Sequence, residues 1–153
     1  MLTGLWHIGL HVSNLERSVA FYRDVLGMTL VHQQEQDNAY TAALVGFPDA
    51  HLKVAQLALP VRPPTAVASH DIELIEYVVP HGTPSPARRC DPGTAHVAFA
   101  VADIDAVCAR LTGHGVRLVS PPNRITSGVN TGGAACYFLD PDGHTLELVQ
   151  PPA

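Results

Sequence analysis

The stretch HIGLHVSNL, residues 7–15, returns in altered form as HVAFAVADI, residues 96–104. Both copies contain a histidine, an apolar run that alternates as a β-strand does, a residue that can cap a helix, and the start of a helical pattern. Each copy later closes on a glutamate between apolar residues, in IEL at 72–74 and in LEL at 146–148. The repeat predicts two related modules, each of which opens with a histidine and closes with a glutamate.

The bulk composition limits the class of protein. Of the 153 residues, 46% are hydrophobic and 15% are charged, which is typical of a globular chain. The net charge of -5 comes with nine Lys and Arg and no basic stripe, so we expect no nucleic-acid partner. No apolar stretch approaches the roughly 20 residues that a membrane span needs. Residues 1–6 lack the regions of a signal peptide, and Cys90, Cys108 and Cys136 lack CxxC spacing, so we expect a cytoplasmic protein with reduced thiols.

In the first module, the alternation predicts a strand at 7–12, and Ser13 or Asn14 can cap the helix that follows. Gly27 is expected to end that helix in a left-handed conformation. The remaining predicted elements are strands at 29–34, 51–59 and 70–79, and a short helix or irregular lobe at 38–46.

Residues 80–94, PHGTPSPARRCDPGT, contain four prolines and two glycines and predict a connection between the two halves. We therefore expect a single domain, 1–153, made of modules at about 4–80 and 94–151. The predicted elements of the second module are strands at 96–101, 117–120, 134–139 and 145–150, and a helix at 104–112 capped by Asp103.

Each half consists of a strand, a helix and three further strands. The predicted fold class is α+β, with paired βαβββ modules that form a cupped, eight-stranded mixed sheet with the helices outside. One half alone would expose an apolar concave face, so each module needs its twin to cover it.

The matched His and Glu positions predict a divalent-metal site. Burying an isolated carboxylate is costly unless it is paired or coordinated, and here two glutamates lie inside apolar phrases. Two imidazoles and two carboxylates brought to one point by a pseudo-twofold axis would bind such an ion. The expected ligands are His7, Glu73, His96 and Glu147. The alternative is that both glutamates face solvent on half-buried strands.

Other residues near these positions leave choices open. Glu76 competes with Glu73 as the first carboxylate, but the equivalent of Glu76 in the second copy is Gln150, which favours Glu73. His11 shares a face with His7 and either contacts a ligand or belongs to the core. The other histidines are expected mostly on the surface or in loops, and we assign them no partner in the repeat. They are His32, His51, His70, His81, His114 and His144.

Three further residues are candidates for contact with a substrate. Tyr77 lies on the strand of Glu73 and would line the cup, although strand aromatics usually pack in the core. Asn123 and Arg124, in the polar segment 120–133, would reach an anionic group of a substrate, or the segment is only a connection.

Three segments, HIGLHVSNLERSVAFYRDVLGM, TAHVAFAVADIDAV and YFLDPDGHTLELVQ, resemble the vicinal oxygen chelate superfamily over nearly the whole chain. This superfamily includes glyoxalase I, methylmalonyl-CoA epimerase, extradiol dioxygenases and the fosfomycin and bleomycin resistance proteins. The resemblance implies paired βαβββ modules around a metal held by His7, Glu73, His96 and Glu147. It also implies a homodimer and a small-molecule substrate. In glutathione-dependent glyoxalase I an arginine stands at the position of His11, where it holds a glutathione carboxylate.

The donor set suits Zn, Ni, Co, Mn or Fe(II). With such a metal as Lewis acid, we expect a lyase or isomerase of glyoxalase type that polarises a small carbonyl or thioester substrate and stabilises an enediolate. Glu73 or Glu147 would be the base if it leaves the metal when the substrate binds. The alternatives are an antibiotic-type binding or resistance protein and an Fe(II) extradiol-type dioxygenase.

Overall fold

The computed structural model describes residues 1–60, 70–85 and 87–152, so residue 86 of the predicted connection lies outside the described residues. The chain divides into two compact units, Met1–Pro84 and Ser85–Ala153. No helix in the described part of the chain is long and apolar enough to cross a membrane.

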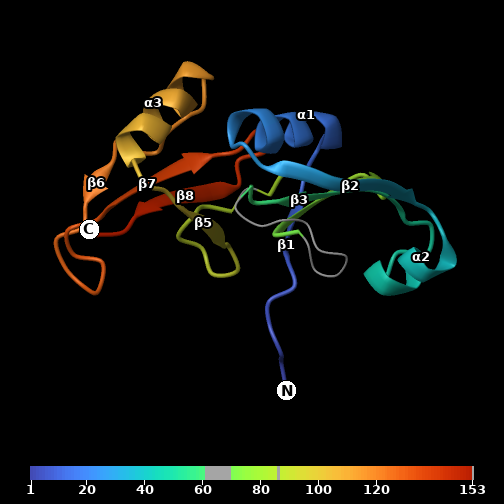
Figure 1. The fold of residues 1–153 in the computed structure, drawn as a ribbon. Coiled ribbons are helices and arrows are strands. Elements are labelled where there is room, and N and C mark those ends of the chain that lie inside the picture. Colours follow the sequence, from blue (N-terminus) through green and yellow to red (C-terminus); the bar gives the residue numbers. More distant parts are fainter. Residues whose placement is uncertain (61–69, 86, 153) are drawn as a thin grey trace. The chain divides into compact units, whose positions relative to one another are not determined.

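The first unit is a four-stranded sheet with the order β1-β4-β3-β2. Strand β1 is parallel to β4, and the other two pairs are antiparallel. In chain order its elements are β1 (Ile8–His11), α1 (Leu15–Ala20), η1 (Phe21–Val25), β2 (Thr29–Gln36), α2 (Ala39–Val45), β3 (His51–Ala58) and β4 (Ile72–Val79) (Figure 1).

The second unit has the same strand connectivity, with the order β5-β8-β7-β6 and β5 parallel to β8. Its elements are β5 (His96–Ala100), α3 (Ile104–Gly113), β6 (Asn123–Arg124), β7 (Ala134–Leu139) and β8 (Thr145–Gln150). The structure therefore confirms the α+β class and the paired βαβββ modules.

The repeated sequence explains how each unit begins. Asn14 and Asp103 cap α1 and α3. Each side chain accepts a hydrogen bond of 2.9 Å from the backbone N–H three residues later in the chain. Gly27 follows the first helix with φ 78°, a left-handed conformation that suits glycine. The expected single helix is in fact two: α1 is followed by the π-helix η1, where Phe21 and Tyr22 are both buried.

Alternation gives each sheet two different faces. In the first sheet, Leu57, Ile72 and Leu74 point towards α1 and are almost fully buried. Glu73 and its register partner Gln56 point to the other face, which we call the Glu73 face. In the second sheet, Phe138, Leu146 and Leu148 are buried in the same way beneath α3.

Two expectations about the elements need comment. The strand predicted at 117–120 is wrong: only Leu118 forms a bridge, to Phe138, and the strand that pairs with β7 in this part of the chain is β6 at Asn123–Arg124. Two prolines, Pro121 and Pro122, interrupt this edge and remove backbone donors. The lobe at 38–46 is a helix, α2, capped by Asn38 and ended by Gly46 at φ 77°.

Candidate metal centre

The first His–Glu pair follows from the parallel pairing of β1 with β4. The Ile8 N–H donates to the Asp71 carbonyl at 3.0 Å, and Gly9 lies opposite Glu73. This register brings His7, just before β1, to the Glu73 side chain, with 3.4 Å between His7 Nε2 and Glu73 Oε2. The Glu73 side chain is 17% exposed and the His7 side chain 30%. The predicted pair is thus together at the edge of the Glu73 face.

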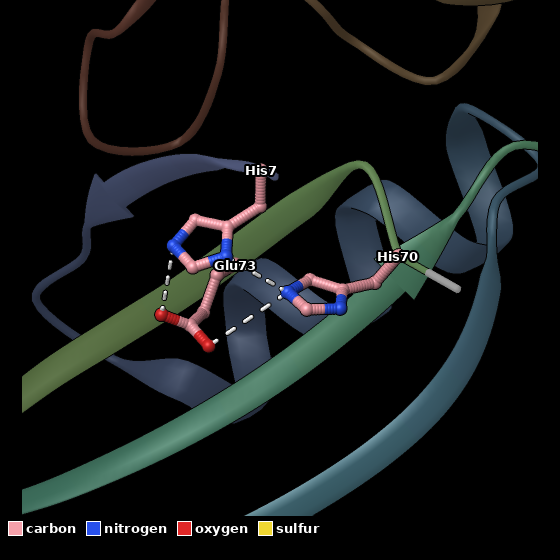
Figure 2. Close-up of side chains that lie close together, drawn as sticks. All are labelled: His7, His70 and Glu73. Carbon is pink, nitrogen blue, oxygen red and sulfur yellow. Dashed lines mark hydrogen bonds and ion pairs between the residues drawn. The ribbon is translucent and has the colours of Figure 1, made fainter. Parts of the chain in front are cut away.

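A third side chain, His70, belongs to the same cluster (Figure 2). Its Nε2 lies 3.1 Å from His7 Nδ1 and 3.9 Å from Glu73 Oε1. The two imidazole rings stack with centroids 4.9 Å apart and planes at 30°. One donor atom from each of the three residues lies within 4.8 Å of the others, and the group could hold a metal ion.

His70 belongs to the histidines expected mostly on the surface or in loops; it does lie in the loop just before β4, but its side chain is buried, with only 6% exposed. Burial lowers the pKa of the His70 imidazole, and the neighbouring His7 lowers it further. A sequence signal did exist. His70 precedes Glu73 by three residues, and His144 precedes Glu147 by three, so these two histidines are partners in the repeat.

Glu73 has one more partner on its sheet face. The Gln56 side-chain amide on β3 donates to Glu73 Oε1 at 3.2 Å. This leaves Oε2 as the oxygen that faces His7. The neighbouring strand therefore fixes the carboxylate from behind.

The second module presents its own pair in the same register. Ala98 lies opposite Glu147, as Gly9 lies opposite Glu73, and His96 Nε2 is 3.0 Å from Glu147 Oε2. The Glu147 side chain is 17% exposed, as is that of Glu73. Tyr137, which pairs with Glu147 in the ladder, places its ring edge-on to His96 with 5.3 Å between centroids.

Glu76 has a different role from Glu73. It points to the opposite face of the sheet, where its Oε2 accepts a hydrogen bond of 2.6 Å from the Leu15 N–H at the start of α1. In the second module Gln150 Oε1 accepts from the Ile104 N–H at 2.8 Å. Position 76 and position 150 are thus helix-start acceptors, and a carboxylate is not required for that role.

The candidate substrate contacts occupy different places. His11 and Tyr77 meet edge-on with centroids 5.4 Å apart. Asn123 shares its sheet face with Glu147 by register, and its side-chain amide donates to Ser120 Oγ and to the Pro121 carbonyl. Arg124 is opposite Ala134 and so lies on the other face of that sheet.

The donor atoms suit a divalent cation. Two ligands that bind one ion at about 2.0–2.2 Å, at a tetrahedral or octahedral angle, lie about 2.8–3.6 Å apart. The His7–Glu73 and His96–Glu147 contacts, at 3.4 Å and 3.0 Å, fall in that range. Imidazole nitrogen and carboxylate oxygen are also the donor types that Zn, Mn, Fe and Ni accept.

Known proteins share both the sequence and the fold. An epimerase from Actinomyces sp. named 2-epi-5-epi-valiolone epimerase is 34% identical over 152 residues, with 96% of this chain and 79% of that protein covered. A lactoylglutathione lyase from Haemophilus influenzae is 30% identical over 145 residues, covering 94% of this chain and 90% of the lyase. A crystal structure of a glyoxalase family protein from Bacillus cereus superposes with a TM-score of 0.81 at 22% identity, covering 100% of this chain and 97% of that one.

Residues 4–148 match the family described as the Glyoxalase/Bleomycin resistance protein/Dioxygenase superfamily. This match takes in both modules, and both of the enzyme relatives span nearly the whole chain. The chain therefore belongs to the Glyoxalase/Bleomycin resistance protein/Dioxygenase superfamily.

Proposed function

We propose that this protein is a metal-dependent lyase or isomerase that moves a proton on the carbon next to a carbonyl group of a small substrate. The observation that carries the proposal is the pair of His–Glu contacts at matched register, His7–Glu73 and His96–Glu147. Relatives named as an epimerase and as lactoylglutathione lyases support an enzyme of this type.

We propose that the two pairs together hold one divalent ion. Each pair offers one imidazole and one carboxylate, so His7, Glu73, His96 and Glu147 would hold the ion. When bound, the metal supplies Lewis-acid polarisation of the substrate's carbonyl oxygen, which makes the adjacent C–H more acidic.

The protein's own part is to take up that proton and return it. One of the two carboxylates, Glu73 or Glu147, would be the base if it leaves the ion when the substrate binds, and each is mostly shielded from solvent. Gln56 holds one oxygen of Glu73 in place. Return of the proton to the opposite face of the same carbon would be an epimerisation, and its return to the neighbouring carbon an isomerisation.

The Glu73 face combines buried Leu52 and Val54 with uncharged polar side chains, and these polar side chains favour an uncharged, polar substrate. By register, His32, Gln34 and Gln36 on β2 lie on the same face as Gln56 on β3. Among the residues of β1–β4, all of which the structure describes, Lys53 is the only lysine or arginine, and it pairs with Glu35 and Glu76 on the α1 face. Carboxamides and imidazoles donate and accept hydrogen bonds as hydroxyl groups require. We therefore propose a hydroxylated carbonyl compound rather than a glutathione adduct.

The test measures how fast metal-loaded protein exchanges the proton on the carbon next to the substrate's carbonyl group for deuterium from the solvent. The substrates are 2-epi-5-epi-valiolone, which the name of the Actinomyces relative contains, and the hemithioacetal of methylglyoxal and glutathione. We expect exchange with the first, and its loss by roughly 100-fold or more in Glu73→Gln and Glu147→Gln, since a positioned base contributes about 10²–10⁴-fold.

Glu76→Gln is the matched control, because Gln150 already fills the equivalent position as an amide. This variant is expected to exchange at the wild-type rate. Exchange that survives complete removal of metal would contradict the proposal, as would oxygen uptake with a catechol in place of proton exchange.

A further inference from the structure

We infer that His70 is a positioning residue of the metal site, one that holds the imidazole of His7 without itself binding the ion. The inference rests on the proposed function only in assuming that His7 and Glu73 are metal ligands. The positions of atoms around His70 carry it (Figure 2).

Each of the two proposed ligands has a near atom and a far atom. The near atoms, His7 Nε2 and Glu73 Oε2, face each other at 3.4 Å. The far atoms, His7 Nδ1 and Glu73 Oε1, lie 3.1 Å and 3.9 Å from His70 Nε2. His70 Nε2 is therefore within hydrogen-bond distance of the His7 nitrogen that an ion bound at Nε2 would leave free, whereas Glu73 Oε1 is held by Gln56.

The protons of the two imidazoles support the same assignment. A histidine that binds a metal through Nε2 carries its remaining proton on Nδ1, and that N–H needs an acceptor. His70 Nε2 is within hydrogen-bond distance of His7 Nδ1, and it can accept when its own proton is on Nδ1. In this arrangement one hydrogen bond sets the tautomer of both rings.

Packing adds a second constraint on the ring of His7. The His70 side chain is 6% exposed, and its ring stacks on that of His7 at 4.9 Å. A buried, stacked neighbour restricts rotation of the His7 imidazole about its side-chain bonds. The ring of His7 is thus held in one orientation before an ion arrives.

The second module provides a comparison within the same chain. His144 has the same offset from Glu147 as His70 has from Glu73, but it lies at the end of a turn. Its N–H donates to Asp140 Oδ1 at 2.8 Å, and its carbonyl accepts from the Asp140 N–H at 3.1 Å. Its side chain is only half-buried. We therefore place the positioning role at His70 and use His144 as the matched control.

The experiment measures Zn²⁺ binding to the full chain by competition with a chelator, for wild type and for His70→Leu, His70→Gln and His144→Leu. We expect His70→Leu to bind one ion 10- to 100-fold more weakly, the usual effect of losing such a partner. His70→Gln retains an acceptor near the position of Nε2, so we expect its affinity to return to within about threefold of wild type. His144→Leu is expected to bind as wild type does.

A second readout separates positioning from general damage to the fold. Long-range ¹H–¹⁵N spectra of Zn²⁺-loaded wild type should show both His7 and His70 protonated at Nδ1, with His70 Nε2 unprotonated and not bound to zinc. A ¹⁵N chemical shift at His70 Nε2 typical of a zinc-bound nitrogen would make His70 a direct ligand and overturn the inference. Complete loss of stoichiometric binding in both folded variants, His70→Leu and His70→Gln, would do the same. Unchanged affinity in His70→Leu would also overturn it.

These outcomes are distinct from those that test the reaction. Zn²⁺ binding that depends on His70, in a protein that exchanges no substrate proton, would remove the proposed function and leave the role of His70 intact. Wild-type protein that binds no Zn²⁺ would remove both.

Discussion

Glu73 and Glu76 are three residues apart on β4, yet their side chains contact different groups. Because side chains alternate across a strand, Glu73 faces two imidazoles and Gln56, whereas Glu76 faces the first turn of α1. The repeat in the sequence is sufficient to choose between them, since the second copy has Glu147 but Gln150 at the matching positions.

The contacts His7–Glu73 and His96–Glu147 could be predicted from the repeat, and the structure has both. Their role as ligands of a shared ion remains a prediction. His70 could not be found from residue type alone, because a single histidine among nine carries little information. Its ring stacks on that of His7, which lies 63 residues away along the chain, and this contact is visible only in the folded structure.

At the residue scale, the thiols give a prediction that is independent of the site. Burial raises the pKa of Cys136 to about 12 and also raises the pKa of Cys108, while Cys90 is exposed. The reactive form is the thiolate, so at about pH 8 the two buried thiols stay protonated and shielded. We expect Ellman's reagent to titrate one thiol in native protein and all three in guanidinium.

The matched variant is Cys90→Ser, which should show no fast-reacting thiol in the native state and two after unfolding. Fast reaction of a second thiol in native protein at that pH would contradict the burial of Cys108 and Cys136.

At the scale of elements, the two modules start their first helices by the same device. Glu76 and Gln150 reach across from the last strand of each module to the first N–H of α1 and α3. An N–H at the start of a helix has no partner within the helix, so a side-chain acceptor stabilises it. The sequence shows that positions 76 and 150 are equivalent in the repeat. Their role as hydrogen-bond acceptors for a helix start is visible only in the structure.

Removal of either acceptor should lower the free energy of unfolding. We expect Glu76→Ala and Gln150→Ala each to cost about 1 kcal/mol, the usual contribution of one such hydrogen bond, measured by urea unfolding. Glu76→Gln should stay within about 0.5 kcal/mol of wild type, because it recreates the arrangement of the second module. Equal destabilisation by Glu76→Gln and Glu76→Ala would show that the hydrogen bond is not the relevant interaction.

Long, strongly patterned elements were the easiest to predict. The bounds of β7 and β8 agree with the alternation, and α3 extends only one residue further than expected. The error at 117–120 came from an edge where the ladder is short. Leu118 makes one bridge, and pairing resumes only at β6, after two prolines. The alternation of apolar and polar residues cannot be recognised in a strand as short as the two residues of β6.

At the scale of the whole molecule, the chain consists of two compact units, each with its own His–Glu pair. We propose that the pairs meet on one ion, within a chain or between two chains of a homodimer. Mixing His7→Ala with His96→Ala protein distinguishes the two arrangements. Neither variant alone should bind metal tightly.

If the site forms between chains, a mixed dimer has one site with both pairs intact. Unfolding and refolding the two variants together should then restore up to about a quarter of the wild-type metal content, as random pairing makes half of the dimers mixed. If the site forms within one chain, no metal returns on mixing. The control is the refolding of each variant by itself.

The central claim is that both modules contribute to one metal site. Its most direct test is the metal content of protein purified without chelator, measured by elemental analysis for wild type, His7→Ala and His96→Ala. The account predicts one divalent ion per chain in wild type. It also predicts loss of that ion in each variant, because His7 and His96 belong to different pairs and both pairs are needed. Metal retained in full by either variant, or a wild-type protein that stays metal-free after exposure to Zn, Ni, Co, Mn and Fe(II), would contradict it.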